Sequence, residues 1–433
     1  MKIRRGSSSF AERGIRRGGP SSIVMRGLRY NADSCKAKKY EDVNMPDGID
    51  GGKGPPILML GSQMAIGGSQ QILLRQSTWF HQHGYSVTVA FLYDKENLLG
   101  IWRAKYPFPI HDLGFARPGS GLFAQLGCFL MGWFRLFRLM RLMRFLAIET
   151  FTAHANLIGL PAAWIAGIPN RVGSHRGKIE RFPHALQRIN AILINSAITT
   201  SLAAVSERVR QEAISEGIRP ERIVKIVNGV DRLKVDQAEV VRVRAELGVR
   251  DDNILLLSVG RLMYQKGHTI LLKALPAVLS KYPGVLTVIA GGGPLLEDLR
   301  AEADQLSISR HVQFLGARDD VPTLMSAADI FLLPSRFEGM PNSVLEAMGQ
   351  GLAVIAADVQ GVDELIRDDQ NGIIVPVNDP SAVGHAILRL LKDPAERERL
   401  GKAAQATIEN NYTVDQMCLK YEKLLTAKQG RSS

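Results

Sequence analysis

The segment Glu338-Gly-Met-Pro-Asn-Ser-Val-Leu-Glu346-Ala-Met-Gly-Gln-Gly351 contains two glutamates separated by seven residues. It follows the apolar run Asp329-Ile-Phe-Leu-Leu-Pro334, so the pattern predicts a buried strand, a turn and then a helix. In open α/β sheets, ligands bind at the carboxyl ends of strands, and the first N–H groups of a following helix attract anions. Either Asn342 or Ser343 is able to cap this helix. The segment therefore predicts a ligand-binding loop.

Strand and helix patterns alternate through most of the chain. Apolar runs at 55–61, 85–91, 253–260 and 286–290 are each followed by a loop and a helical pattern. Strict alternation predicts parallel sheets that are covered by helices on both faces. A length of 433 residues corresponds to two or three domains. We therefore expect an α/β fold with more than one sheet.

The composition indicates a globular protein with an anionic partner. Hydrophobic residues make up 45% of the chain, and the formal net charge is +12 at pH 7. Nucleotide, phospholipid and nucleic acid are all possible partners for such a charge, which alone does not choose among them. Cys35, Cys128 and Cys418 show neither metal-ligand spacing nor a disulfide pattern, which fits a reducing, cytosolic compartment.

The first part of the chain carries no sign of a fold or of a signal peptide. Residues 1–54 are rich in Gly, Ser and Arg without a hydrophobic period, so we expect a disordered basic leader and assign it no function. The start, Met1-Lys-Ile-Arg-Arg-Gly-Ser-Ser-Ser, lacks the apolar core of a signal peptide. No uninterrupted run reaches the roughly 18 apolar residues that span a bilayer. We expect the protein to stay on one side of any membrane.

Two loops at predicted strand ends carry residue types that suit a diphosphate. Gly67 and Gly68 follow the first strand, where glycine lets backbone N–H groups approach a phosphate or sugar closely. Arg261 and Lys266 follow the strand at 253–260; arginine grips a diphosphate with two hydrogen bonds, and lysine supplies a point charge. Taken alone, the glycines also fit a tight turn, and the cations also fit a solvated loop.

Together these motifs resemble those of the retaining glycosyltransferases of family 4, which have the GT-B fold. The segment 338–351 is similar to the family's acidic motif, and Arg261-Leu followed by Lys266-Gly267 is similar to its diphosphate loop. Asn228-Gly-Val-Asp231 matches another signature, whereas Gln360-Gly361-Val-Asp-Glu364 keeps only one of two usual glycines. The resemblance covers about residues 55–427. It implies two Rossmann-like parallel-sheet domains that face each other across a cleft.

The resemblance also implies the division of the chain. An N-terminal acceptor domain is expected at 55–230, and a nucleotide-sugar donor domain is expected at 231–410. Residues 411–433 are expected to form a helix that crosses back to the first domain, followed by a tail.

The activity that the resemblance implies is transfer of a sugar from a UDP- or GDP-linked donor to an acceptor hydroxyl, with retention of the anomeric configuration. The implied catalytic residues are His154, Glu338, Arg261 and Lys266. The implied donor-binding residues are Gly67, Gly68, Arg261, Lys266, Glu338, Gly339, Met340, Asn342, Ser343, Val344 and Glu346. Within these sets, Glu346 is expected on the ribose hydroxyls and Glu338 on the donor sugar, and His175 matches a less constant polar position. We expect no metal ion and no cofactor besides the nucleotide sugar.

Three other functions remain open. Tandem βαβ units also build NAD-dependent oxidoreductases, although Pro294 and Glu297 interrupt the Gly-x-Gly-x-x-Gly spacing after Gly291. An epimerase of the GT-B fold that acts on nucleotide sugars would share this architecture. A non-catalytic binder of membrane or nucleic acid would explain the charge but not the acidic motif. The spacing of the two glutamates, together with the two cations, favours sugar transfer.

Residues 122–148 predict a long helix that combines apolar residues with arginines. At about 100° per residue, one half of this helix carries Trp133, Leu136, Leu139, Met140, Met143 and Leu146. The other half carries its four arginines, and such a helix is able to lie in a membrane interface with the arginines on anionic headgroups. The alternative is that the apolar half packs on the first sheet. We expect a cytoplasmic protein, peripheral at the inner face of the membrane, with a lipid-linked or polysaccharide precursor as acceptor and no nucleic acid partner.

Overall fold

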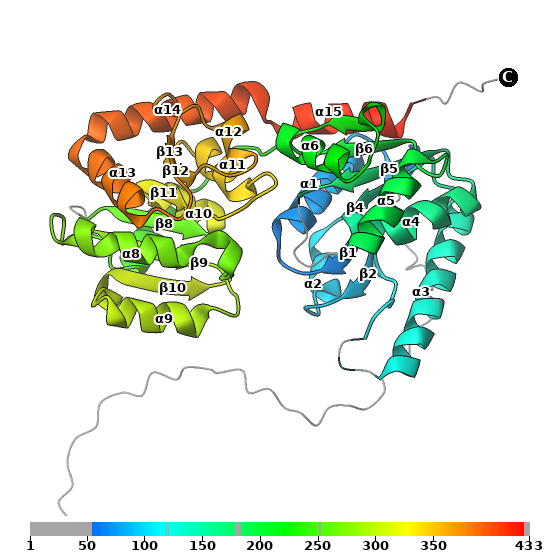
Figure 1. Cartoon of the computed structure of the whole chain (residues 1–433), viewed down its shortest axis with the longest axis horizontal. Helices are drawn as coiled ribbons and strands as arrows, with labels where there is room; N and C mark the ends of the chain where they lie inside the picture. Colours follow the sequence, from blue (N-terminus) through cyan, green and yellow to red (C-terminus); the bar gives the residue numbers. More distant parts are fainter. Residues whose placement is uncertain (1–53, 118, 120, 178–182, 251–252, 428–433) are drawn as a thin grey trace, which may run out of the picture. The chain divides into compact units, whose positions relative to one another are not determined.

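The computed structural model describes residues 54–117, 119, 121–177, 183–250 and 253–427 (Figure 1). The leader predicted for 1–54 lies outside these residues except for Gly54, and so do the last residues of the predicted tail, 428–433. All other predictions fall mainly on described residues.

The first sheet has seven parallel strands in the order β3-β2-β1-β4-β5-β6-β7 (Figure 1). Its strands are β1 (Pro56–Met64), β2 (Ser86–Asp94), β3 (Ile110–Asp112), β4 (Ala147–Phe151), β5 (Asn170–His175), β6 (Ser201–Ala204) and β7 (Ile223–Lys225). The helices between them are α1 (Gly68–Gln82), α2 (Leu99–Lys105), α3 (Leu122–Met143), α4 (Ala153–Ala166), α5 (His184–Asn195) and α6 (Glu207–Ser215), with a short 3-10 turn at Pro220–Arg222.

The second sheet has six parallel strands in the order β10-β9-β8-β11-β12-β13. Its strands are β8 (Leu255–Val259), β9 (Leu286–Ala290), β10 (Val312–Gly316), β11 (Ile330–Leu333), β12 (Ala353–Ala357) and β13 (Ile373–Val375). The accompanying helices are α7 (Gln237–Glu246), α8 (His268–Leu279), α9 (Leu296–Gln305), α10 (Val321–Ala327), α11 (Asn342–Gly349), α12 (Val362–Leu365), α13 (Pro380–Lys392) and α14 (Pro394–Asn411), with 3-10 turns at Tyr264–Lys266 and Ser309–His311. The prediction of two Rossmann-like parallel sheets is confirmed.

The central strands of these sheets contribute to two hydrophobic cores each. In β1, Ile57 and Met59 pack with α1, α2 and α15 (Val414–Leu425), whereas Leu58 and Leu60 pack with α3 and α4 on the other face. Alternate residues of a strand point to opposite faces, so a sheet that is covered twice needs apolar residues at both parities. This requirement explains the continuous apolar runs in the sequence.

The last helix, α15, packs on the first sheet although the second sheet precedes it in the chain (red in Figure 1). The two connections between the sheets are hydrogen-bonded to each other, because Val230 N–H donates to Tyr412 O at 2.8 Å. A side chain at Gly229 would place its Cβ 2.3 Å from Thr413 O. The boundary predicted at 230/231 falls between β7 and β8 and stays a prediction.

Helix α3 is shorter than predicted from the sequence, and the face predicted to contact a membrane is buried in the protein. It ends at Met143, and Arg144 adopts a left-handed φ of 48° before β4 begins. Leu136, Leu139 and Met140 are buried in the core of the first sheet, so the half predicted for the membrane packs on the protein itself. By length and composition alone α3 is nevertheless long and apolar enough to cross a membrane, because its arginines interrupt the apolar residues without making the whole helix polar.

Two glycines in helix interiors predict opposite effects on stability. A Cβ at Gly401 in α14 would lie 2.1 Å from Gly351 O, whereas one at Gly384 in α13 would lie 3.5 Å from Ala274 O, an ordinary contact. Gly401→Ala should therefore lower the free energy of unfolding by about 1–3 kcal/mol through overpacking. Gly384→Ala should raise it by up to about 1 kcal/mol, because alanine loses less backbone entropy in a helix. Urea unfolding measures both, and a stabilising Gly401→Ala would contradict this packing.

Candidate functional site

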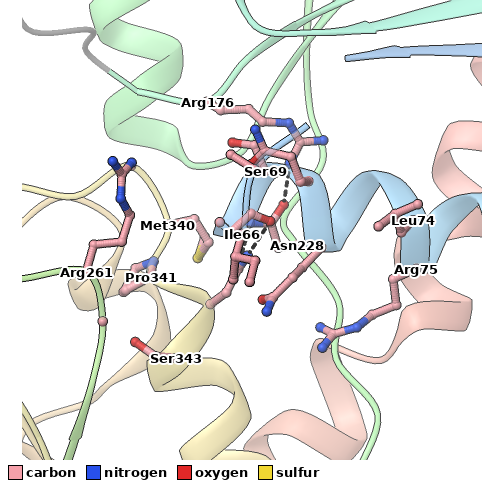
Figure 2. A pocket seen from close by; sticks show the side chains of 18 of the residues that line it. Ile66, Ser69, Leu74, Arg75, Arg176, Asn228, Arg261, Met340, Pro341 and Ser343 are labelled. Carbon is pink, nitrogen blue, oxygen red and sulfur yellow. Dashed lines mark hydrogen bonds between the residues drawn. The ribbon is translucent and has the colours of Figure 1, made fainter. Parts of the chain in front are cut away.

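A cavity of about 1940 Å³ lies at the carboxyl ends of strands from both sheets. In each sheet the strand order reverses beside the first strand, between β1 and β4 and between β8 and β11. The loops that follow these four strands are not crossed by a connecting helix, which leaves room for a ligand. Figure 2 shows side chains of the β1 loop and α1, such as Ile66 and Arg75, across from Met340 and Ser343 of the β11 loop and α11.

The structure brings most of the predicted site residues together. The cavity is lined by Gly67, Gly68, His154, Arg261, Lys266, Glu338, Gly339, Met340, Asn342, Ser343 and Glu346. Val344 is not among the lining residues: its side chain is buried in the core, and its N–H donates to Pro341 O. His175 also lies outside the wall and contacts Glu216 at 3.2 Å.

Glu338 is held by two donors. Its Oε1 accepts from Lys266 Nζ and from Ser335 Oγ, each at 2.7 Å. Only 6% of the Glu338 side chain is exposed, so this ion pair is well shielded from water. The pair fixes the ammonium group of Lys266 at the end of β8, beside the loop of the exposed Arg261.

Glu346 is paired with a cation that the sequence did not suggest. Arg75 of α1 donates from Nη2 to Glu346 Oε1 at 2.7 Å, and both residues line the cavity. The two side chains are 28% and 20% exposed, so water screens this pair only partly. The ion pair connects a helix of the first sheet to α11 of the second.

The beginning of α11 differs from the prediction. The N-cap residue is Pro341, and neither Asn342 nor Ser343 caps the helix, because both lie inside it. No side chain caps α11 within the described residues, so its first N–H groups are not satisfied by a capping side chain. A helix end of this kind favours an anion.

Asn342 instead joins the two sides of the cavity. Its Nδ2 donates to Gly68 O at 3.0 Å, while its Oδ1 accepts from Asn228 Nδ2 at 2.7 Å. Asn228 Oδ1 in turn accepts from Arg176 Nη1 at 3.1 Å. The Gly-rich loop, the link between the sheets and the β5 loop are therefore connected through one side chain of α11.

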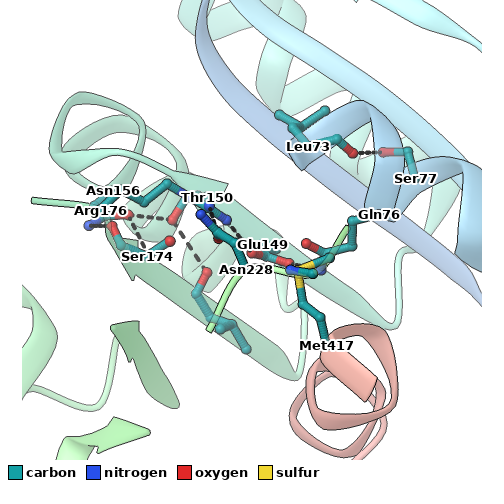
Figure 3. Close-up of polar contacts among 12 residues, drawn as sticks. Leu73, Gln76, Ser77, Glu149, Thr150, Asn156, Ser174, Arg176, Asn228 and Met417 are labelled. Carbon is teal, nitrogen blue, oxygen red and sulfur yellow. Dashed lines mark hydrogen bonds and ion pairs between the residues drawn. The ribbon is translucent and has the colours of Figure 1, made fainter. Parts of the chain in front are cut away.

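A buried carboxyl group lies beneath Arg176 (Figure 3). Glu149 in β4 is fully buried, its Oε2 accepts from Gln76 Nε2 at 2.5 Å, and its Oε1 lies 3.8 Å from Arg176 Nη2. Burial raises the pKa of the Glu149 carboxyl to about 8, although the positive charge of Arg176 opposes the rise. The guanidinium also stacks on Phe151, with 4.5 Å between Cζ and the ring centroid. These contacts hold Arg176 at the cavity wall.

Glycines allow the backbones of the two sides to approach each other. A Cβ at Gly339 would lie 2.1 Å from Arg176 O, and one at Gly361 would lie 2.5 Å from Gly339 O. Gly361 also has a left-handed φ of 77°. The single glycine retained in the segment 360–364 is therefore one that the close backbone approach requires.

His154 stands in the first turn of α4, directly after β4, and partial burial lowers the pKa of its imidazole. Sequence reasoning missed Arg75, Arg176 and Glu149. Only the loop position of Arg176, beside a predicted strand end, was a usable signal for any of them. Within the described part of the chain, no group of three or more His, Cys, Asp or Glu side chains is placed to hold a metal ion.

Comparisons with known families match both halves of the chain. A family model described as Glycosyltransferase Family 4 matches residues 66–232, and one described as Glycosyl transferases group 1 matches residues 241–407.

Individual proteins show the same relationship. The chain is 32% identical to the uncharacterized glycosyltransferase MJ1607 of Methanocaldococcus jannaschii, over 54% of this chain and 60% of that protein. It is 28% identical to the UDP-Gal:alpha-D-GlcNAc-diphosphoundecaprenol alpha-1,3-galactosyltransferase of Escherichia coli, over 57% of this chain and 66% of that protein. Anabaena HepE, solved in complex with UDP-glucose, has the same fold with a TM-score of 0.76 and 22% identity, over 86% of this chain and all of that one.

The raised pKa of Glu149 predicts a pH-dependent stability. Because folding raises the pKa from 4.5 to about 8, the folded protein keeps a proton that the unfolded chain releases between these values. The free energy of unfolding should therefore fall as pH rises through this window, by at most about 1.4 kcal/mol per pH unit. Glu149→Gln cannot titrate and should remove this fall. Urea unfolding of both proteins at pH 5.5, 6.5 and 7.5 gives the free energy of unfolding at each pH. An equal dependence of this free energy on pH in both proteins would contradict the prediction.

Proposed function

The chain belongs to the family 4 glycosyltransferases, and from this premise we propose that it transfers a sugar from a nucleotide diphosphate to an acceptor hydroxyl in the cavity described above. The observation that carries the proposal is the meeting of Arg261, Lys266 and the uncapped end of α11 in one cavity. Two cations and a helix N-terminus suit a diphosphate. The presence of UDP-glucose in HepE supports a UDP-linked donor.

Arg261 and Lys266 stabilise the charge that develops on the departing diphosphate. Fixed charges in a partly desolvated site stabilise such charge without reorganisation during the reaction. Glu338 holds Lys266 in place and offers its second oxygen to a hydroxyl of the donor sugar. Because protein cations meet the diphosphate, the proposed reaction uses no metal ion and no cofactor beyond the nucleotide sugar.

The stereochemical proposal is retention, which rests on the resemblance of the acidic motif to that of retaining enzymes. The expected product has the same anomeric configuration as the donor. Proton NMR of the newly formed linkage decides this point, and an inverted linkage would refute it.

The alternative functions are not favoured. Glycosyltransferase models match both halves of the chain, and the relatives described above have glycosyltransferase names.

Substitution of Lys266 tests the assignment of the diphosphate site. Lys266→Ala should slow turnover of the nucleotide sugar about 100- to 1000-fold, the usual effect of removing one electrostatic contact to a transition state. Lys273→Ala is the matched control, because Lys273 lies on α8 with 59% of its side chain exposed and is not among the lining residues. The release of nucleotide diphosphate measures both rates.

Near-normal turnover of Lys266→Ala would refute the assignment. The same assay with EDTA tests the proposed independence from metal ions, since a loss of activity that added Mg²⁺ or Mn²⁺ restores would contradict it.

The two glutamates should act on different parts of the donor. Glu346→Gln should weaken the binding of UDP and of UDP-glucose equally, by about 10- to 100-fold, because a hydrogen bond to a charged group contributes about 1.5–3 kcal/mol. Glu338→Gln should weaken the binding of UDP-glucose and leave the binding of UDP unchanged. Isothermal titration with both ligands gives the four affinities.

Arg75→Gln distinguishes ribose binding from support of the ion pair. If Glu346 binds the ribose, this variant should lose less affinity for UDP than Glu346→Gln does, because the carboxylate remains although Arg75 no longer neutralises it. Equal losses in Arg75→Gln and Glu346→Gln would show that Glu346 serves only to hold Arg75.

The acceptor is proposed to be a lipid-linked or polysaccharide precursor at the inner face of the membrane. The diphosphoundecaprenol in the name of the Escherichia coli relative supports an acceptor of this kind. Helix α3 also supports it, because the apolar residues Leu130, Phe134 and Leu142 are 61–67% exposed beside the exposed Arg138 and Arg141. This exposed side, rather than the buried half predicted from sequence, would contact lipid headgroups.

Liposome flotation tests the membrane contact. Wild-type protein should float with anionic vesicles, and Arg138→Glu with Arg141→Glu should abolish flotation, because reversed charges repel the headgroups. Lys281→Glu with Arg310→Glu is the control: it makes the same change of net charge at exposed positions far from α3 in the sequence, in the turn after α8 and in the 3-10 turn before β10. Wild-type protein that never floats, or an equal loss of flotation in both variants, would refute the proposed membrane contact.

A further inference from the structure

The wall of the cavity differs in chemical character from place to place. On the side of the second sheet it contains glycines and charged groups, including Gly291, Arg261 and Glu338, beside apolar residues such as Val259 and Met340. On the side of the first sheet it extends to Ile158 of α4, Phe115 of the loop after β3, and Phe129 of α3. We call these last three residues the apolar wall.

The apolar wall begins next to His154. His154 and Ile158 are four residues apart in α4, so their side chains lie one above the other on the same face of the helix. Both line the cavity. A molecule with a hydroxyl group at His154 would therefore have its next atoms beside Ile158.

The aromatic part of the wall is held rigidly. Phe115 and Phe129 contact each other edge to face, with ring centroids 5.7 Å apart and an interplanar angle of 80°. Phe115 packs over Gly132 of α3, where a Cβ would lie 2.6 Å from the ring. Phe115 is 6% exposed, whereas Phe129 is 42% exposed, so the wall opens outward at Phe129.

Exposed apolar residues continue the wall along α3. Leu126 and Leu122 precede Phe129 by three and seven residues and therefore share its face of the helix. Their exposed fractions rise to 57% and 82%. An apolar path thus runs from the interior of the cavity to the surface of the protein.

We propose that the apolar wall binds the hydrocarbon tail of an amphiphilic acceptor, whose hydroxyl end lies at His154. This inference rests on the proposed function and names the class of its acceptor. A glycan chain would lose hydrogen bonds to water against Ile158, Phe115 and Phe129, since none of these side chains has a polar atom. A hydrocarbon tail gains from the same burial. The wall belongs to the same cavity as His154, which favours a part of the substrate over a second protein as its occupant.

A photoreactive alkyl glucoside tests the proposal directly. The probe is a dodecyl glucoside with a diazirine at the end of its chain, used below its critical micelle concentration, and mass spectrometry maps the labelled peptides. Labelling should concentrate on the peptides that contain Phe115, Phe129 and Ile158. An excess of dodecyl glucoside should compete with it, and glucose should not.

Two matched variants make the test specific. Phe129→Ser should reduce labelling at least fivefold, while Phe123→Ser should leave it unchanged. Both residues are exposed phenylalanines of α3, but Phe123 is 89% exposed and does not line the cavity. Equal labelling of the two variants, or wild-type labelling spread evenly along α3, would overturn the proposal.

A separate measurement keeps this result distinct from the proposed function. Slow hydrolysis of UDP-glucose should be the same in wild type and in Phe123→Ser, because Phe123 does not line the cavity. Absence of hydrolysis and of UDP-glucose binding in both proteins would count against sugar transfer, whereas the labelling pattern alone decides whether the apolar wall binds a tail.

Discussion

The reversal of strand order in each sheet is the constraint on which the site depends. Both sheets add strands to either side of their first strand, so the connections after β1 and β4, and after β8 and β11, leave in opposite directions. The glycines, the histidine, the cations and the acidic segment all follow these four strands. The topology therefore brings together residues that are distant in the sequence. The chemical groups of each loop come from the few residues that follow its strand.

A second constraint is the close approach of backbones at Gly339. This turn contacts the β5 loop and Gly361 at distances that exclude a Cβ, and Ser206 Oγ donates to Gly339 O at 3.0 Å. The hydrogen bonds of Asn342 and Asn228 extend the same contact to the Gly-rich loop. Arg176 links this surface network to the buried Glu149, whose carboxyl group has no access to water. Loop geometry at the cavity is thus tied to the core of the first sheet.

Those parts of the site that have a short-range sequence pattern could be predicted. Contacts between residues that are far apart in the sequence could not. Strand ends, glycine loops and the acidic segment have short-range signals, and nearly all of their predicted residues line the cavity. Arg75 reaches Glu346 across 271 positions, and nothing in an amphipathic helix marks one arginine as a partner. Periodicity placed Leu136 and Leu139 on one face of α3 correctly. It could not show that the protein's own sheet covers this face, because a core and a membrane impose the same pattern.

The ion pairs explain how an anion-binding cavity tolerates an acidic motif. Two free glutamates would repel a diphosphate, and a buried carboxylate without a partner is costly. Here Lys266 neutralises Glu338 and Arg75 neutralises Glu346, so both carboxylates offer hydrogen-bond acceptors to hydroxyl groups without adding net negative charge. Arg261 is exposed and has no ion-pair partner among the described residues, so its charge is uncompensated in the loop after β8. The cavity therefore combines acceptors for sugar hydroxyls with a cation for phosphate, which are the two requirements of a nucleotide sugar.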